Sequence, residues 1–175
     1  MEDYLNKYLD LIRSIPDFPQ KGIIFKDITP LIKDSNAFGS AVNDMTHPFL
    51  NDDIDIVVAV EARGYIFGAP MATRLNCGFV PVRKQGKLPY STSSIEYSLE
   101  YGTETLEIHQ DAILKGQKVL LVDDVLATGG TLKAAIQLVE KVGGDVEGIA
   151  VLIDLVQLHA SDIFSPYKFF SLLDI

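Results

Sequence analysis

Apolar side chains recur along this chain in two alternating patterns, one typical of helices and one typical of buried strands. Apolar residues spaced as on a helix from Leu5 to Ile15 predict a first amphipathic helix, which Pro16 ends. The same spacing predicts further helices over residues 38–49, 64–75 and 131–142. Each is followed by a polar or Gly-containing segment, so the helices are separated by connections rather than continuous.

Continuous apolar runs rich in β-branched residues lie between these helices. They predict buried strands over residues 54–60, 79–82, 118–122 and 149–155, and residues 95–108 predict two further strands joined by a tight antiparallel turn. Strands alternating with helices of about a dozen residues are typical of an α/β fold. We therefore expect a central, mainly parallel sheet flanked by helices, with ligands bound beyond the carboxyl ends of its strands.

Composition and charge narrow the possible partners. The chain has 24 acidic and 15 basic residues, a formal net charge of -9, which disfavours a general electrostatic grip on nucleic acid or anionic membranes. The only cysteine, Cys77, cannot form an internal disulfide, and no apolar run approaches the roughly 20 residues that span a bilayer. With an acidic rather than basic start, the sequence predicts a cytoplasmic protein.

The strand predicted over residues 118–122 is followed by residues suited to binding a sugar phosphate. Asp123 and Asp124 follow one strand, and small residues from Ala127 to Thr131 then offer backbone amides to an anion. Adjacent carboxylates suit sugar hydroxyls or a hydrated metal, so together these features indicate a ribose phosphate site. No lysine follows Gly130 and no Gly-x-Gly-x-x-Gly motif is present, which weakens a Walker A or dinucleotide site.

The remaining polar residues include one further anion-binding candidate and three histidines with no predicted role. Arg63 follows another strand and precedes a glycine, a position that favours anion capture over a surface ion pair. The three histidines are scattered without metal-ligand spacing, and we expect them at the surface: His47, His109 and His159.

Residues 119–131, VLLVDDVLATGGT, resemble the phosphoribosyl diphosphate signature of the type I phosphoribosyltransferase family. Residues 18–28, 61–64, 83–89 and 97–102 resemble, in order and spacing, the adenine-specific members of that family. The likeness runs from the first predicted helix to about Leu155. One departure is Lys26, where the family usually has arginine, so a bidentate side-chain role is in doubt there while a backbone contact is not.

The resemblance implies the type I phosphoribosyltransferase fold in one domain spanning residues 1–175. Within it, an N-terminal hood (residues 1–35) would cover the purine, and a flexible antiparallel lid or hairpin (residues 84–107) would close over the site. The implied reaction transfers the 5-phosphoribosyl group from phosphoribosyl diphosphate to adenine, giving AMP and diphosphate with Mg²⁺ as cofactor. The implied assembly is a homodimer.

Two other functions stay open. A relative on the same scaffold could use xanthine or a 6-oxopurine, or the chain could be a regulator that binds phosphoribosyl diphosphate without catalysis. A regulator would ordinarily carry a DNA-binding module or a basic face, and this acidic chain shows neither.

The resemblance also implies roles for individual residues. Asp123 and Asp124 would bind the ribose hydroxyls directly or through a water on the metal, with no direct protein ligand to the metal, and Glu100 would lie near the purine and ribose as a further catalytic carboxylate. The remaining substrate-binding residues fall into three sets: for the 5′-phosphate, Ala127, Thr128, Gly129, Gly130 and Thr131; for diphosphate, Arg63, Arg83, Lys84 and Lys87; for the purine and its surroundings, Ile24, Phe25, Lys26, Tyr101 and Leu155.

Overall fold

The computed structural model describes residues 7–98 and 102–175, which divide into two compact units, 1–44 and 45–175. In the first unit, β1 (Arg13–Pro16) and β2 (Ile24–Asp27) form an antiparallel pair in which Ile15 lies opposite Phe25. They are followed by α2 (Thr29–Lys33) and α3 (Ser35–Thr46).

The predicted helix through Ile15 is wrong beyond Leu9, since residues 13–16 are a strand. A proline disfavours the helical conformation of the residue before it, so Ile15 is extended, and pairing with β2 overrides the helical spacing of the apolar residues.

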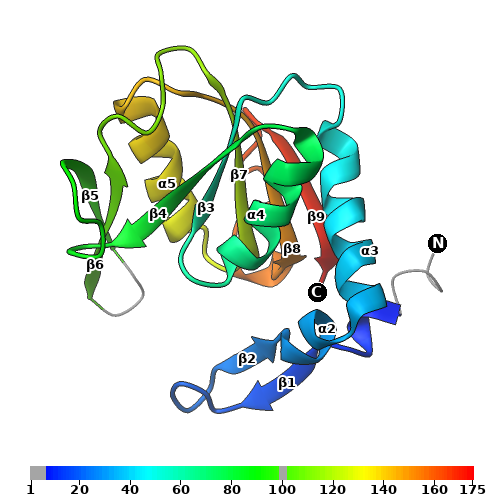
Figure 1. The fold of residues 1–175 in the computed structure, drawn as a ribbon. Coiled ribbons are helices and arrows are strands. Elements are labelled where there is room, and N and C mark those ends of the chain that lie inside the picture. Colours follow the sequence, from blue (N-terminus) through cyan, green and yellow to red (C-terminus); the bar gives the residue numbers. More distant parts are fainter. Residues whose placement is uncertain (1–6, 99–101) are drawn as a thin grey trace. The chain divides into compact units, whose positions relative to one another are not determined.

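The second unit is built on a seven-stranded sheet (Figure 1). Its strands are β3 (Ile56–Val60), β4 (Gly78–Lys84), β5 (Thr92–Ser98), β6 (Thr103–His109), β7 (Lys118–Leu126), β8 (Asp145–Asp154) and β9 (Lys168–Asp174). Their order is β5-β6-β4-β3-β7-β8-β9, and all neighbours from β4 to β9 are parallel. β5 and β6 form an antiparallel hairpin that continues the sheet beside β4. The predicted α/β class with a mainly parallel sheet is confirmed.

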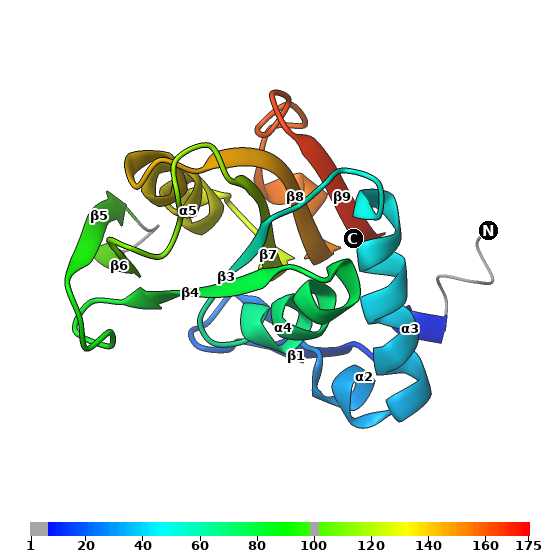
Figure 2. The ribbon, with the colours of Figure 1, turned by 45° about the horizontal axis from the view of Figure 1, so that its top comes forward.

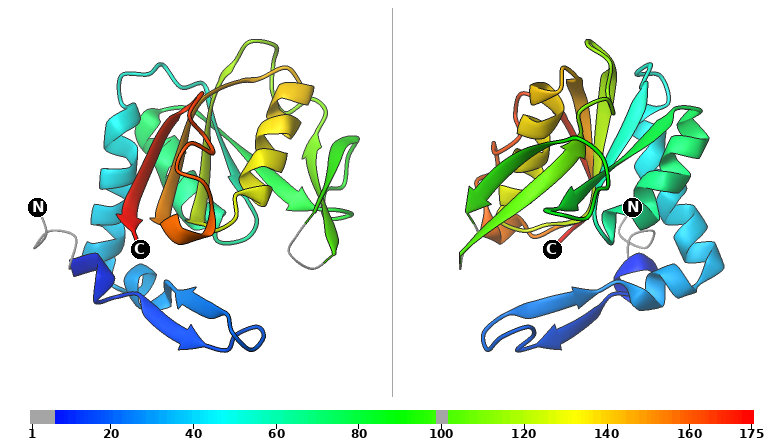
Figure 3. Two further views of the ribbon diagram at one scale, coloured as in Figure 1. Left: turned by 180° about the vertical axis from the view of Figure 1, so that it is seen from behind. Right: turned by 60° about the vertical axis from the view of Figure 1, so that its left-hand side comes forward.

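Helices cover both faces of this sheet. α4 (Gly64–Leu75) lies on one face and α5 (Gly130–Lys141) on the other (Figures 2 and 3). Side chains of β3 pack on both faces of the sheet. Ile56, Val58 and Val60 belong to the core cluster that includes the buried side of α5. Towards α4, the helix approaches so closely at Gly68 that an added Cβ would lie 2.7 Å from Ala59 Cβ.

The connections leave β3 and β7 in opposite directions along the sheet. β3 connects through α4 to β4 on one side, and β7 connects through α5 to β8 on the other, although β3 and β7 are themselves neighbours. At such a switch point the loops after the two strands diverge and open a crevice at their carboxyl ends. Arg63 and the segment after Leu126 both lie at this edge.

Several elements differ from the sequence-based prediction in extent. β7 continues through both aspartates to Leu126 instead of ending at Val122, and β4 includes Arg83 and Lys84. The helix predicted over residues 38–49 is α3 followed by the short 3-10 helix η1 (His47–Phe49), whereas β9 and the 3-10 helix η2 (Val156–Leu158) were not predicted.

Among the helices in the described part of the chain, none has both the length and the apolar character needed to cross a membrane.

Candidate active site

A polar cavity of about 220 Å³ opens at the switch point, between the carboxyl ends of β3 and β7 and the β5-β6 hairpin. Its wall is made of residues from β3, β4, β7 and the hairpin, from the first turn of α5 and from the loop after β3: Val60, Glu61, Ala62, Arg63, Lys84, Tyr97, Glu104, Leu106, Asp123, Asp124, Val125 and Thr131. The structure thus brings together five predicted site residues from three separate parts of the sequence: Arg63, Lys84, and the group Asp123, Asp124 and Thr131.

Asp123 and Asp124 are buried carboxyl groups in the wall of this cavity. Only 9% of Asp123 and 4% of Asp124 is exposed, and the Asp124 N–H donates to Asp123 Oδ1 over 2.9 Å. Burial, reinforced by the neighbouring charge of Asp124, raises the pKa of Asp123 well above its ordinary 3.8. Burial also raises the pKa of Asp124, although the positive charge of Arg63 opposes that rise. A cation or a hydroxyl donor next to these carboxylates would therefore stabilise their charged forms.

Arg63 lies opposite this pair. It directly precedes α4, and its Nε lies 2.9 Å from Asp124 Oδ2 in an ion pair. This ion pair compensates the burial of that oxygen. A carboxylate oxygen has a second acceptor position, which a ligand hydroxyl or the water of a hydrated cation can use.

The segment Ala127–Gly130 joins β7 to α5 and forms the predicted phosphate loop. With Thr131 and neighbouring residues it surrounds a second cavity of about 70 Å³ that adjoins Asp123. Gly129 has a φ of 84°, the left-handed region that favours glycine, and stands at the N-terminal end of α5. Because exposed amides and the helix dipole attract negative charge there, this loop suits a phosphate.

Three polar side chains of this site were not predicted: Glu61, Tyr97 and Glu104. The Tyr97 hydroxyl donates to Glu104 Oε2 over 3.1 Å and lies 3.3 Å from Thr131 Oγ1, so the threonine donates to the tyrosine. Glu104 also pairs with Lys84 Nζ. The two-residue alternation of the hairpin strands was the available signal, since it places Tyr97 and Glu104 on the same side of their paired strands.

Glu61 ties down two basic residues beside the cavity. Its Oε2 lies 2.9 Å from Arg83 Nε, and its Oε1 accepts the Lys84 N–H over 2.6 Å. Arg83 also donates to the Lys87 carbonyl oxygen over 2.9 Å. Of the cations predicted for diphosphate, Arg63 and Lys84 line the cavity, whereas Arg83 and Lys87 do not.

The residues predicted for the purine are distributed differently. Leu155 follows β8 in the second unit and donates its N–H to Leu126 O over 2.9 Å, directly before the phosphate loop. Ile24, Phe25 and Lys26 lie on β2 in the first unit, where Lys26 Nζ donates to Ser14 Oγ over 3.1 Å. Glu100 and Tyr101 lie outside the described residues.

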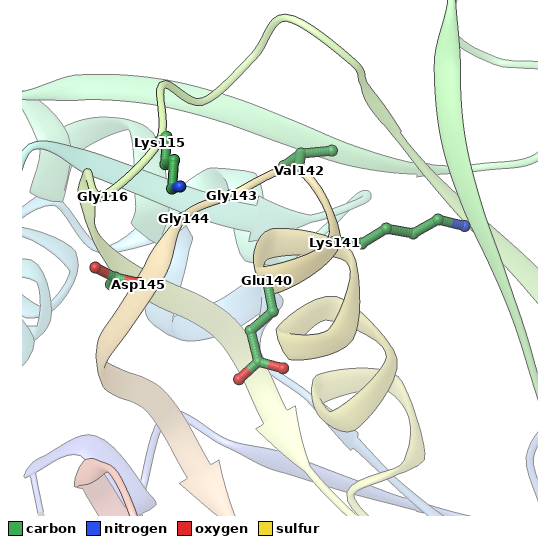
Figure 4. A pocket seen from close by; sticks show the side chains of 8 residues that line it. All are labelled: Lys115, Gly116, Glu140, Lys141, Val142, Gly143, Gly144 and Asp145. Carbon is green, nitrogen blue, oxygen red and sulfur yellow. The ribbon is translucent and has the colours of Figure 1, made fainter.

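A wider hollow of about 460 Å³ lies at the other end of the sheet (Figure 4). It is formed where α5 ends and β8 begins, and its charged side chains are Lys115, Glu140, Lys141 and Asp145. Both signs of charge surround it, and the Glu140 and Lys141 side chains point apart. We therefore place the site at the switch point, where buried carboxylates face a phosphate loop.

The switch-point residues fit Mg²⁺ only as a partner of a bound phosphate. Mg²⁺ prefers oxygen ligands and keeps several waters, and the buried carboxylates of Asp123 and Asp124 offer oxygens and negative charge. Within the described ranges, no three His, Cys, Asp or Glu side chains are grouped closely enough to hold a metal. Most ligands of such an ion must therefore come from water and substrate oxygens.

Comparisons with known proteins agree with this geometry. Residues 29–174 match the phosphoribosyl transferase domain family. The chain is 59% identical to an adenine phosphoribosyltransferase of Thermotoga neapolitana over 93% of its own length and 95% of that protein.

Solved structures of adenine phosphoribosyltransferases share the fold. The enzyme from Thermoanaerobacter pseudethanolicus superposes with a TM-score of 0.94 at 51% identity, covering 98% of this chain and 99% of that one. The Saccharomyces cerevisiae enzyme, solved with an imino-altritol bisphosphate and adenine, gives a TM-score of 0.89 at 34% identity, covering 99% and 100%. The chain therefore belongs to the adenine phosphoribosyltransferases of the type I phosphoribosyltransferase family.

Proposed function

We propose that this protein transfers the 5-phosphoribosyl group of phosphoribosyl diphosphate to adenine, producing AMP and diphosphate in purine salvage. The observation that supports this most directly is the pair of buried carboxylates next to a phosphate loop at the switch point of the sheet. An acidic protein gains affinity for a polyanion only where local groups hold it, and the two adjoining cavities provide those groups.

We assign the sugar end of the donor to β7 and the start of α5. The 5′-phosphate would occupy the 70 Å³ cavity, held by the amides from Ala127 to Gly130 and by the Thr131 hydroxyl. Asp123 and Asp124 would accept hydrogen bonds from the ribose hydroxyls. Holding the sugar by both ends fixes its anomeric carbon relative to the incoming base, which lowers the entropic cost of reaction.

The diphosphate would lie in the 220 Å³ cavity between Arg63 and Lys84. As this leaving group departs, the ribose ring gains positive charge and the diphosphate gains negative charge. Carboxylates on the sugar side and cations on the diphosphate side stabilise both. Mg²⁺, when bound with the donor, would neutralise part of the diphosphate charge, with Asp123 and Asp124 holding its waters.

We also propose that the lid predicted over residues 84–107 closes by exchanging ion pairs. Lys84 is paired with Glu104, and Arg83 with Glu61, so each cation is already charged and positioned near the cavity. A bound diphosphate would compete with those carboxylates for the same cations. In this proposal Arg83 and Lys87 also bind the diphosphate. Glu100 is proposed to act near the purine and ribose as a further catalytic carboxylate.

For the base, the proposal rests on adenine-type hydrogen bonding. A 6-amino purine presents a donor at N6 and an acceptor at N1, whereas a 6-oxo purine reverses that pattern and leaves buried groups unpaired. Leu155 is proposed to contact the ring, and the contributions of Ile24, Phe25, Lys26, Tyr101 and the hood (residues 1–35) stay predictions.

Two further properties are proposed alongside the reaction. We propose a homodimer, as the family resemblance implies, and light scattering that gives only monomer at micromolar concentration would contradict it. We propose a cytoplasmic location because the only cysteine is free and composition gives no sign of an oxidising compartment.

One assay tests the reaction. The purified protein is incubated with Mg²⁺, phosphoribosyl diphosphate and, separately, adenine, hypoxanthine, guanine or xanthine, and nucleotide and diphosphate are quantified. We expect AMP and equimolar diphosphate with adenine alone. Turnover of another purine would identify a different specificity, and donor binding without turnover of any purine would identify a regulator.

A further inference from the structure

His159 is buried and paired, contrary to the surface position that the sequence predicted. Its side chain is 5% exposed, and Nε2 lies 2.6 Å from Oδ1 of Asp154, itself 8% exposed. His159 Nδ1 lies 2.9 Å from the Ala160 carbonyl oxygen. A carboxylate and a carbonyl are both acceptors, so the ring makes both contacts as hydrogen bonds only when each nitrogen carries a proton. In that state the pair is an imidazolium opposite a carboxylate.

This ion pair closes the start of the loop that follows β8, residues 155–165. Asp154 is the last residue of β8 and Leu155 is the next, so the contact from His159 back to Asp154 encloses the residue proposed to contact the purine. Asp154, His159, Ile163 and Phe164 surround a small cavity of about 110 Å³ under Leu126. The loop is thus fastened at its base to the strand end.

The same loop supports the phosphate loop from below at two points. At the beginning, the Leu155 N–H donates to Leu126 O over 2.9 Å. Near the end, the Ile163 side chain fills the space beside Gly129, where an added Cβ would lie 2.5 Å from Ile163 Cδ1. A shift of residues 155–165 would therefore move the phosphate loop and Leu155 together.

We propose that Asp154 and His159 are positioning residues, whose ion pair holds residues 155–165 so that the phosphate loop keeps the shape that binds the 5′-phosphate. This inference rests on the proposed function, because it assumes that Ala127–Gly130 binds the phosphate of the donor and of AMP. It adds that phosphate affinity depends on the protonation of a residue that does not itself line either cavity of the site.

The surroundings of His159 set the pH range of this effect. Burial alone lowers the pKa of His159, but the bonds to Ala160 O and to Asp154 outweigh it and raise the pKa above the ordinary 6.5. Among the described residues, Tyr167, which donates to Glu140 of α5, lines the same cavity as the pair, Asp174 lies opposite Asp154 on β9, and Asp162 is an exposed residue of the loop itself. Because the charged ring is favoured in the folded protein, its contribution is complete below pH 6.5 and is lost as pH rises through the raised value.

Two measurements test the proposal. The first follows the ring carbons of the three histidines by NMR in the unmodified protein from pH 5 to 9, and we expect one of them, missing from His159→Gln, to titrate above 6.5. The second measures AMP affinity by calorimetry over the same range for the unmodified protein, His159→Gln and the matched control His47→Gln, whose histidine is exposed. The ionisation of AMP itself affects all three proteins equally.

We expect the AMP dissociation constant of His159→Gln to be about tenfold higher at pH 6.5, as for the loss of a coupled contact worth about 1.4 kcal/mol. The unmodified protein and His47→Gln should lose that advantage as pH rises, and KM for phosphoribosyl diphosphate should rise in His159→Gln with kcat little changed. A ring that titrates at or below 6.5, or equal AMP affinities of the unmodified protein and His159→Gln at every pH, would overturn the inference alone. If the unmodified protein binds neither AMP nor donor, the proposed function fails and this inference with it. Should His159→Gln not fold, the ring titration and the pH dependence of the unmodified protein decide.

Discussion

Replacing Gly129 by alanine places a methyl group at the tightest point beneath the phosphate loop. Two separate costs follow from the structure. Gly129 has a φ of 84°, a conformation that costs an L-residue about 1 to 2 kcal/mol relative to glycine. In addition, the new Cβ would lie 2.5 Å from Ile163 Cδ1, far inside van der Waals contact. Both costs apply to the folded state only.

The contact should add about 1 to 2 kcal/mol, the lower part of the range for overpacking, since the clashing atom ends a side chain that can move. Reduced freedom of the unfolded chain returns about 0.5 kcal/mol. We therefore expect Gly129→Ala to lower the free energy of unfolding by about 2.5 kcal/mol, which is a drop of about 5 to 10 °C in Tm for a chain of this size.

Ile163→Val separates the two costs, because it removes the methyl group that the new Cβ meets. Urea denaturation of the two single variants and the double variant forms a double-mutant cycle, in which Ile163→Val should restore about 1 kcal/mol to Gly129→Ala. Gly130→Ala is the matched control: its added Cβ meets Ser98 O at an ordinary 3.5 Å, and Gly130 does not have a positive φ. Equal losses for Gly129→Ala and Gly130→Ala, or a cycle without coupling, would refute this description of the loop.

Three further predictions concern the polar network around the site. The raised pKa of Asp123 means that the folded protein binds this proton more tightly than the unfolded one, so the protein should lose stability as pH rises above 3.8. Asp123→Asn should remove this pH dependence, which thermal melts from pH 4 to 8 measure. An unaltered pH slope would contradict it. The same variant should lower kcat about 100-fold. Tyr97→Phe should raise KM for phosphoribosyl diphosphate about threefold to tenfold, because it removes the hydroxyl that links Thr131 to Glu104. Steady-state kinetics at saturating adenine measure this KM, and an unchanged value would contradict the prediction. Glu104→Gln should strengthen product inhibition by diphosphate about threefold, because Lys84 loses its charged partner. The control Glu147→Gln changes an exposed residue of β8 and should leave the inhibition constant unchanged. Equal inhibition constants for the two variants would exclude competition for Lys84.

The fold was largely predictable because apolar periodicity and burial agree through the second unit. The helix over residues 64–75 and the alternation of helices with buried strands follow from patterns that packing against the sheet leaves intact. The prediction failed where pairing with another segment decides the conformation. Residues 13–16 have helical spacing but pair with β2, and β9 follows a connection whose helix, η2, is a single short turn with no helical periodicity to mark a crossover.

The candidate site was predictable where neighbouring residues carry the chemistry together. Asp123, Asp124 and the loop from Ala127 are adjacent in the chain, so their types alone indicate a sugar phosphate. Tyr97 and Glu61 were missed because each contacts a partner distant in the sequence, Thr131 and Arg83 respectively. His159 was missed because the contact with Asp154, five residues before it, depends on how the loop after β8 folds back. Single residues of these types are common on surfaces, and only the three-dimensional contacts distinguish them.

The path of β7 has a consequence for how this enzyme could be altered. The strand runs without interruption from the interior, where Val119 to Val122 are fully buried between β3 and β8, into the two aspartates. Any change that displaces those carboxylates must also disturb the packing of the middle of the sheet. Variation in substrate preference is therefore more accessible in the hairpin and in residues 155–165 than at the two carboxylates proposed to bind the sugar, because those carboxylates are anchored to the interior of the sheet.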